Sequence, residues 1–366
     1  DIVVIGEGEE TAVELAQRLK NKNSIDDVKG IGFKTRYGDY RINVERPFIN
    51  ELDNYRMDFQ LVDLERYIDE KITSVNGAKK VTRSIGYITS RGCPFSCTFC
   101  YNQAFNKRKW RAYSISAVEK DIQFLKNTYG INRIHFWDDN FFANRERAIE
   151  ILERIKMPSG IDIRIDSIDE DLTKKFNDLG VDFLLIGAES GSDRILRLMD
   201  KKFDSAQTLE KVKILAKYNI NTLYSFILAT PTETREELEQ TLDFMLEIHK
   251  LHKESSFTVG MYQPYPGTEL YKLAIQEGFQ EPVTTEEWNL IDRWKNTVKL
   301  PWIEQKSALH IRLLFAILGW NWKFVNWWIE FRIRHRILRL SYDIKTLILM
   351  NNIKNRLFRI NLARSS

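Results

Sequence analysis

Residues 84–102 read Ser84-Ile-Gly-Tyr-Ile-Thr-Ser-Arg-Gly-Cys93-Pro-Phe-Ser-Cys97-Thr-Phe-Cys100-Tyr-Asn102. The apolar start, 84–89, predicts a β-strand, and the residues after it hold all three cysteines of the chain. A loop that directly follows a strand and carries three thiols within eight positions is a candidate metal centre at the end of a sheet strand.

Outward from this stretch, strand and helix patterns alternate along the chain. Strands are predicted at 84–89, 133–137, 162–165, 183–187, 222–228 and 257–263. Helices are predicted after a capping box at Ser116 and Glu119 and at 145–155, 170–179, 205–218, 234–251 and 269–277. Six βα units predict an α/β fold with a parallel sheet, a partial (β/α)6 TIM-like barrel or a strongly curved open sheet.

Each predicted strand is followed by a cluster of polar, glycine or proline residues. These clusters begin near Arg91, Asp138, Arg164, Gly187, Thr230 and Pro264. Because the carboxyl ends of parallel strands meet at one edge of a sheet, we expect the clusters to form one shared site.

The spacing of the cysteines narrows the kind of metal centre. Structural zinc takes four ligands, and no histidine is close in sequence, since the nearest is His135. Iron–sulfur clusters are held by thiolates, and three cysteines on a 4Fe–4S cluster leave one iron open for a substrate or cofactor. The alternatives are a zinc-stabilised scaffold, a simple electron carrier, and three cysteines without a metal.

The motif Cys93-x-x-x-Cys97-x-x-Cys100, followed by Tyr101-Asn102, resembles the signature of the radical S-adenosylmethionine (radical SAM) superfamily, and the resemblance covers residues 80–280. Three features are similar to the subgroup with an N-terminal cobalamin-binding domain: residues 6–9 before a helix, residues 63–67, and residues 187–192. The chain departs from that subgroup because it contains no Asp-x-His-x-x-Gly motif, and residues 227–234 lack a glycine before the proline. The chain begins at Asp1, and we expect a missing upstream segment, so cobalamin is expected only where that domain is present.

The resemblance implies that Cys93, Cys97 and Cys100 bind three irons of a 4Fe–4S cluster and that S-adenosylmethionine binds the fourth. It also implies that an electron from the cluster breaks a carbon–sulfur bond and yields a 5′-deoxyadenosyl radical. The residues expected to bind the cofactor are Phe99 at the adenine, Asp138 and Asp139 at the ammonium group, Arg164 at the carboxylate, and Glu189 and Ser190 at the ribose or methionine end. No residue is assigned to a catalytic step.

Some of these residues also have a structural interpretation. Residues 138–140 could cap a following helix, and Arg164 could form an ion pair with Asp166. The five histidines show no metal-binding spacing, and we interpret them as ordinary surface or core residues.

The N-terminal residues 1–46 are interpreted as a short α/β remnant of a cobalamin-binding-like domain. We predict a buried strand at 2–5, a Gly-x-Gly turn, a helix at 11–19 and a hairpin at 31–46. The turn could bind a phosphate, but Glu7, Glu9 and Glu10 would repel it, so a plain βα turn is favoured. Residues 47–83 are expected to be an irregular linker before the barrel at 84–300.

Residues 301–366 are expected to form an α-helical extension that is both basic and aromatic. They hold 12 Lys and Arg against 3 Asp and Glu, and five of the nine tryptophans. A helix at 307–340 would place Val325, Ile329, Ile333 and Ile337 on one stripe. The alternatives are a cap over the barrel or a dimer surface, peripheral contact with a membrane surface, and, less favoured, nucleic acid.

The composition is that of a globular protein, with 43% hydrophobic and 29% charged residues. No apolar run reaches the ~18 residues of a transmembrane helix, and the expected location is the cytoplasm or a membrane periphery. The resemblance to the cobalamin-binding subgroup, which often transfers methyl groups, makes methyl transfer to an unreactive carbon the first functional hypothesis. Radical cyclisation or rearrangement of a tetrapyrrole- or lipid-like substrate is the second. A non-catalytic iron–sulfur or zinc module, or an inactive fragment, is the competing class. The expected partners are a small-molecule or lipid-like substrate and an external reductant such as flavodoxin or ferredoxin.

Overall fold

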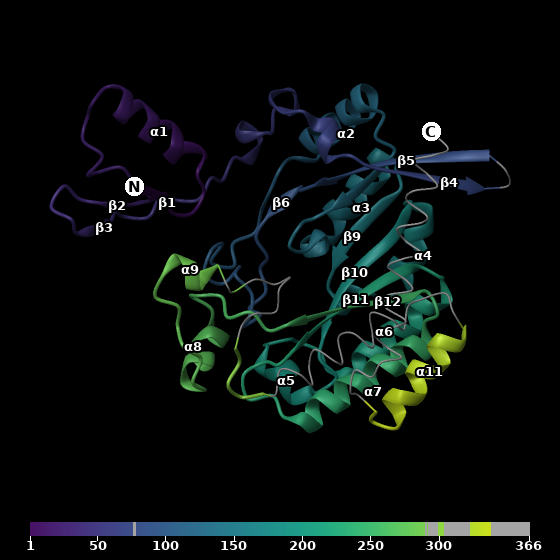
Figure 1. Ribbon diagram of the computed structural model, residues 1–366. Helices are drawn as coiled ribbons and strands as arrows, with labels where there is room; N and C mark the ends of the chain where they lie inside the picture. Colours follow the sequence, from purple (N-terminus) through teal and green to yellow (C-terminus); the bar gives the residue numbers. More distant parts are fainter. Residues whose placement is uncertain (76–77, 290, 292–298, 304–322, 338–366) are drawn as a thin grey trace, which may run out of the picture.

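The computed structural model describes residues 1–75, 78–289, 291, 299–303 and 323–337. In this part of the chain a seven-stranded sheet runs in the order β12-β11-β10-β9-β8-β5-β4 and curls into half of a barrel (Figure 1). Its strands are β4 (Asp69–Val75), β5 (Ala78–Tyr87), β8 (Arg133–Phe136), β9 (Ser159–Ile163), β10 (Val181–Glu189), β11 (Asn221–Leu228) and β12 (Ser255–Met261). All neighbours are parallel except β4 and β5, which confirms the predicted partial TIM-like barrel.

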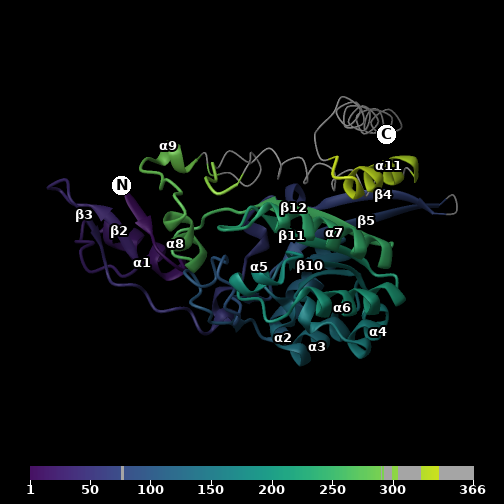
Figure 2. The same cartoon turned by 90° about the horizontal axis from the view of Figure 1, so that it is seen from below.

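Helices connect consecutive parallel strands, and α2, α3, α4 and α6 line up along one side of the sheet (Figure 2). They are α2 (Ile115–Tyr129), α3 (Arg145–Ile155), α4 (Glu170–Asp178), α5 (Asp193–Leu198), α6 (Ser205–Lys217) and α7 (Arg235–Leu251). The capping box predicted at Ser116 is wrong. Helix α2 begins one residue after Ser114, whose hydroxyl accepts the Ala117 N–H and so leaves Ser116 inside the first turn.

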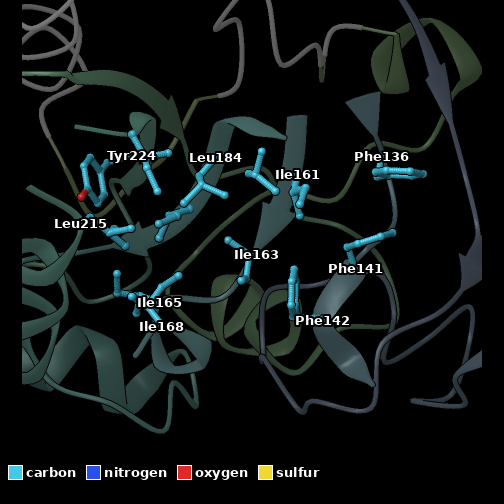
Figure 3. Close-up of a cluster of buried hydrophobic side chains, with 14 of the residues drawn as sticks. Phe136, Phe141, Phe142, Ile161, Ile163, Ile165, Ile168, Leu184, Leu215 and Tyr224 are labelled. Carbon is cyan, nitrogen blue, oxygen red and sulfur yellow. The ribbon is translucent and has the colours of Figure 1, made fainter. Parts of the chain in front are cut away.

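The hydrophobic core lies between the sheet and these helices. Side chains alternate along each strand, so every second residue enters the core while the others face the barrel interior. Figure 3 shows this core, with Phe136, Ile161 and Leu184 from the strands close to Phe141 and Leu215. Each fully buried side chain of this size contributes about 1.5–3 kcal/mol, so the core holds the strands and their carboxyl ends in place.

The N-terminal residues form a separate antiparallel sheet of β1 (Ile2–Val4), β2 (Ile31–Lys34) and β3 (Tyr40–Ile42), with α1 (Glu9–Lys20) after β1. The predicted helix and hairpin are present. The first strand is not buried as predicted, because it is an edge strand and the small core here is built around Val28, Ile31 and Phe33. Val3 is consequently 65% exposed.

The segment 47–83 is more regular than expected. It contains short 3-10 helices at Leu52–Tyr55, Phe59–Leu61 and Leu64–Tyr67, all of β4, and the first part of β5. Strand β4 pairs with β5 from Asp69 opposite Ser84 to Val75 opposite Ala78. Because this hairpin is rich in Lys, Ser and Thr, and residues 69–73 of β4 are exposed, it lacks the apolar pattern that reveals a buried strand.

Beyond the sheet, the structure describes α8 (Glu269–Gln276), α9 (Thr285–Trp288) and α11 (Lys323–Arg334). In α11, Ile329 and Ile333 are fully buried in the main core, and the Arg336 guanidinium that follows the helix pairs with Asp243 of α7 at 2.7 Å. This contact agrees with the interpretation of the tail as a cap over the barrel. The Val325 side chain and most of 301–366 lie outside the described residues. None of the helices in the described ranges is both long and apolar enough to cross a membrane.

Candidate active site

The cysteine loop, residues 92–110, leaves the sheet after β5 between the short strands β6 (Ser90–Arg91) and β7 (Arg111–Ala112). All three cysteines are free thiols; Cys97 is buried, and Cys93 and Cys100 are half-buried. The loop opens at Gly92, which has a φ of 84° and where an added Cβ would collide with the Lys109 carbonyl. Only glycine fits there, so the sequence Arg-Gly-Cys sets the path of the loop.

Two side chains donate hydrogen bonds to cysteine sulfurs. The Arg164 guanidinium lies 3.5 Å from the Cys97 sulfur, and the Asn102 amide nitrogen lies 3.7 Å from the Cys100 sulfur. Burial raises the pKa of Cys93 to about 11 and also raises the pKa of Cys100. Burial therefore disfavours the charged thiolate form of both side chains.

The chemistry of the donor set suits an iron–sulfur cluster, because such clusters are held by thiolates. Within the described part of the chain, no three His, Cys, Asp or Glu side chains are grouped to hold one metal ion. In an iron–sulfur cluster each thiolate binds a different iron, so the sulfurs stand farther apart than around zinc. The free thiols with two donors to sulfur fit such a cluster.

Asp138 and Asp139 hold the cysteine loop in place from the end of β8. The buried Asp138 carboxylate accepts hydrogen bonds from the Thr89 N–H at 3.1 Å and the Thr89 hydroxyl at 2.8 Å, and it also binds the Ser90 hydroxyl. Asp139 accepts from the Gly92 N–H at 3.1 Å and the Tyr101 hydroxyl at 2.7 Å. Neither residue caps α3, because that helix is capped by Asn144.

Glu189, at the end of β10, forms a buried ion pair that sequence analysis missed. Its carboxylate lies 2.9 Å from the Lys201 ammonium group, and both side chains are at most 8% exposed. Burial alone would lower the pKa of Lys201, but the charges of Glu189 and Cys97 outweigh it and raise that pKa. Glu189 has a φ of 67°, and its carboxylate folds over Gly187, where a Cβ would occupy the same space.

The other residues predicted to bind the cofactor are Phe99, Arg164 and Ser190, and they differ in their contacts. Phe99 lies under Lys201, whose ammonium group is 5.4 Å from the ring centroid. Arg164 pairs with Asp166 at 2.7 Å, which agrees with its structural interpretation, and it also contacts the Cys97 sulfur at 3.5 Å. Ser190 is fully buried against the Thr241 hydroxyl at 3.2 Å and braces a turn.

A cavity of about 220 Å³ lies beside the cysteine loop at the carboxyl ends of β10, β11 and β12. Phe99 and Glu189 line it together with Tyr262 and Gln263. The Tyr262 hydroxyl and the Gln263 carbonyl oxygen are buried and have no hydrogen-bond partner among the described residues. Buried polar atoms nearly always have partners, so these two atoms are unsatisfied within the described part of the chain.

The N-terminal turn docks onto the cysteine loop through Glu7. Its carboxylate binds the Arg91 guanidinium at 2.9 Å, the Arg111 guanidinium at 2.7 Å and the Ile49 N–H at 2.7 Å. The pKa of Glu7 is lowered, because these hydrogen bonds outweigh the opposing effect of its burial. The acidic turn that disfavoured phosphate binding therefore joins the N-terminal unit to both ends of the loop.

This chain is similar to known proteins over most of its length. Residues 87–245 match the family model of the Radical SAM superfamily. An uncharacterized methyltransferase of Pyrococcus horikoshii is 32% identical over 300 residues, which cover 80% of this chain and 62% of the relative. The anaerobic magnesium-protoporphyrin IX monomethyl ester cyclase of Cereibacter sphaeroides is 27% identical over 74% of this chain and 44% of the relative. The chain thus spans less than two thirds of either relative.

A solved structure shares the fold. The radical S-adenosylmethionine methyltransferase TsrM from Kitasatospora setae, determined with cobalamin and a [4Fe-4S] cluster, aligns with a TM-score of 0.57 at 16% identity. The alignment covers 77% of this chain and 57% of that one. The family match, the relatives and the shared fold confirm the resemblance identified from the cysteine motif, and residues 87–245 of this chain form a radical SAM superfamily domain.

Proposed function

We propose that this chain is a radical SAM enzyme that holds a 4Fe–4S cluster on Cys93, Cys97 and Cys100 and S-adenosylmethionine in the adjacent cavity. The cysteine loop carries the proposal, because three free thiols receive two hydrogen bonds beside a cavity with orphaned polar atoms. When bound, the two cofactors supply reductive cleavage of a carbon–sulfur bond, which yields a 5′-deoxyadenosyl radical. The electron comes from an external reductant, such as flavodoxin or ferredoxin.

The residues of this chain then have distinct roles. Phe99 packs against the adenine, and Glu189 binds the ribose or the methionine ammonium group while Lys201 holds it in place. Arg164 donates to the Cys97 thiolate and offsets its charge. Asp138 and Ser190 support the loop and the turn, since their oxygens are already bonded to protein groups.

Asp139 is a candidate both to support the cysteine loop and to bind the ammonium group of S-adenosylmethionine. Its carboxylate already binds the Gly92 N–H and the Tyr101 hydroxyl of the loop, and it lies among the strand-end residues.

Methyl transfer to an unreactive carbon is the reaction that we infer. It is supported by the methyltransferase of Pyrococcus horikoshii and by the fold shared with TsrM. Methyl transfer of this type also needs cobalamin, which we propose only for a protein that carries the rest of the N-terminal domain. The cyclase relative favours a second candidate, radical cyclisation of a tetrapyrrole-like substrate.

The test is anaerobic reconstitution, reduction and addition of S-adenosylmethionine, with products identified by mass spectrometry. We expect 5′-deoxyadenosine, and S-adenosylhomocysteine as well if cobalamin is bound and methyl transfer occurs. Cys97→Ala is expected to lose iron, whereas Phe105→Ala, at an exposed position of the same loop, is expected to keep it. Full iron content in Cys97→Ala, or neither product from a fully loaded cluster, would remove the proposal.

Peripheral membrane contact through 301–366 is a separate proposal. It is tested by liposome flotation of the chain with and without these residues. Equal recovery of both proteins would remove it.

A further inference from the structure

The inner face of the half-barrel carries a row of rings that the proposed cofactor chemistry does not use. His135 on β8 lies between Trp137 at the end of that strand and Phe183 on β10. Its ring centroid is 5.9 Å from that of Trp137 and 5.6 Å from that of Phe183. Trp137 is 63% exposed and Ile88 of the neighbouring chain segment is 51% exposed, so the row presents an apolar surface to the barrel interior.

Glycines on the neighbouring strands let two of these rings lie close to the sheet. Gly86 on β5 lies under Trp137, where an added Cβ would come within 3.2 Å of the indole. Gly160 on β9, paired with His135 in the sheet register, would place a Cβ 2.7 Å from the imidazole Nδ1. Three atoms of the Trp137 ring lie at 3.2–3.4 Å from the Cβ position of Gly86, so the indole lies with one face over that glycine, and the His135 ring is turned 71° from it.

One hydrogen-bond acceptor accompanies the rings. The His135 Nε2 atom lies 2.9 Å from Asp162 Oδ1, and the two side chains are 20% and 30% exposed. The second carboxylate oxygen, Asp162 Oδ2, has no hydrogen-bond partner in the part of the chain that the structure describes. A partly buried carboxylate oxygen of this kind accepts hydrogen bonds from N–H or O–H groups.

The row lies at the reacting end of the barrel. Trp137 directly precedes Asp138 and Asp139, whose carboxylates hold the start of the cysteine loop. At the opposite end of the same strand, Arg133 pairs with Asp182 at 2.7 Å. A molecule on Trp137 is therefore held next to the strand end that carries the cysteines.

We propose that the substrate is a planar aromatic ring system with an N–H or O–H donor, stacked on Trp137 and donating to Asp162 Oδ2. This inference rests on the proposed function and names its substrate class. An aliphatic lipid would bury apolar area on Trp137 but would use neither the ring face nor the acceptor. Stacking of an aromatic ring on the Trp137 indole adds an interaction between the two rings that an aliphatic group does not provide.

The experiment uses two planar probes of matched shape, indole and benzofuran, of which only indole has an N–H donor. Dissociation constants are measured by ligand-observed NMR on the cluster-loaded protein without reductant. We expect indole to bind about 10-fold more tightly than benzofuran, as for a hydrogen bond to a charged acceptor. Asp162→Ala should bring the ratio close to one, and Asp162→Asn, which conserves size, should lower it if the alanine variant does not fold.

Trp137→Ala should weaken both probes by about 3- to 10-fold, the range of one aromatic pair. Tyr67→Ala removes an aromatic ring of similar exposure, 67%, outside the barrel and should change neither constant. Equal binding of the two probes to the native chain, or unchanged binding to Trp137→Ala, would overturn the inference. Because the assay needs no cleavage of S-adenosylmethionine, either result can occur while 5′-deoxyadenosine still forms, and the two proposals fail separately.

Discussion

Replacing Glu7 by glutamine tests how the N-terminal turn holds the cysteine loop. The carboxylate accepts hydrogen bonds from Arg91, Arg111 and the Ile49 N–H at 2.7–2.9 Å, and the Arg111 side chain is only 8% exposed. Glutamine keeps the shape but removes the charge and turns an NH₂ group toward the guanidinium groups. A hydrogen bond to a charged group contributes about 1 kcal/mol more than a neutral one, and an unpaired buried charge costs about 3–5 kcal/mol. We therefore expect a loss of about 2–4 kcal/mol.

Thermal unfolding at neutral pH measures this loss. A change of 2–4 kcal/mol corresponds to a decrease in Tm of about 4–16 °C at the 2–4 °C per kcal/mol of a domain of 150–250 residues. Glu45→Gln is the matched control, because Glu45 pairs with Lys107 while 67% exposed. An exposed ion pair contributes about 0–1 kcal/mol, so the control should unfold close to the native protein.

The stability that the Glu7 ion pairs contribute should depend on pH. Since the pKa of Glu7 is lowered in the folded protein from its ordinary value of 4.5, its ion pairs stabilise the fold fully above pH 4.5. This stability is lost as the pH falls through the folded pKa, and the difference between Glu7→Gln and the native protein should shrink there. Equal Tm values for the Glu7 and Glu45 variants at neutral pH, or a difference that does not shrink in acid, would refute the reasoning.

Three further substitutions probe the site and the cap. Lys201→Met leaves a buried carboxylate unpaired, so calorimetry on cluster-loaded protein should show S-adenosylmethionine binding at least about 10-fold more weakly, whereas the exposed Lys202→Met should not change it. Gly187→Ala places a methyl group where the same carboxylate lies, and the same titration should show a loss of about 10-fold; unchanged affinity would contradict the role of that carboxylate. Ile333→Ala removes a fully buried side chain of α11 and should cost about 2–5 kcal/mol in urea unfolding, with Ile337→Ala, 43% exposed, as the milder control. An equal loss in both isoleucine variants would contradict the packing of α11 on the barrel.

The repeat of strands and helices was predictable because the core selects for periodic apolar residues. Helix α3 occupies the predicted range 145–155, and the strands from β8 onward lie at or near their predicted positions. Strand β4 was not predictable in this way. Its pairing with β5 is made by backbone hydrogen bonds at an exposed sheet edge, where Lys, Ser and Thr are as suitable as apolar residues.

The parts of the site whose chemistry requires a particular residue type could be predicted from the sequence. Contacts between residues that are far apart in the sequence could not. Three cysteines at short spacing identify themselves, whereas nothing in the sequence separates the buried Lys201 from the exposed Lys202 beside it. Asp138 was expected at the cofactor, yet its carboxylate is used by the Thr89 hydroxyl and N–H, a contact between two strand ends that spacing does not reveal.

The charges around Cys97 support its proposed role as a ligand, although it is the most buried of the three thiols. Removing a thiolate from water is costly, and Cys97 is 8% exposed, so it has the least help from solvent. It is also the thiol with a cation in contact, since Arg164 donates to its sulfur at 3.5 Å and Lys201 adds positive charge nearby. The charge of Lys201 is balanced by Glu189, and Arg164 is also paired with Asp166. Arg164 is nevertheless the cation closest to the Cys97 sulfur, so it is the nearest group that offsets the charge of a thiolate there. The protein thus places fixed positive charge beside the sulfur that water reaches least.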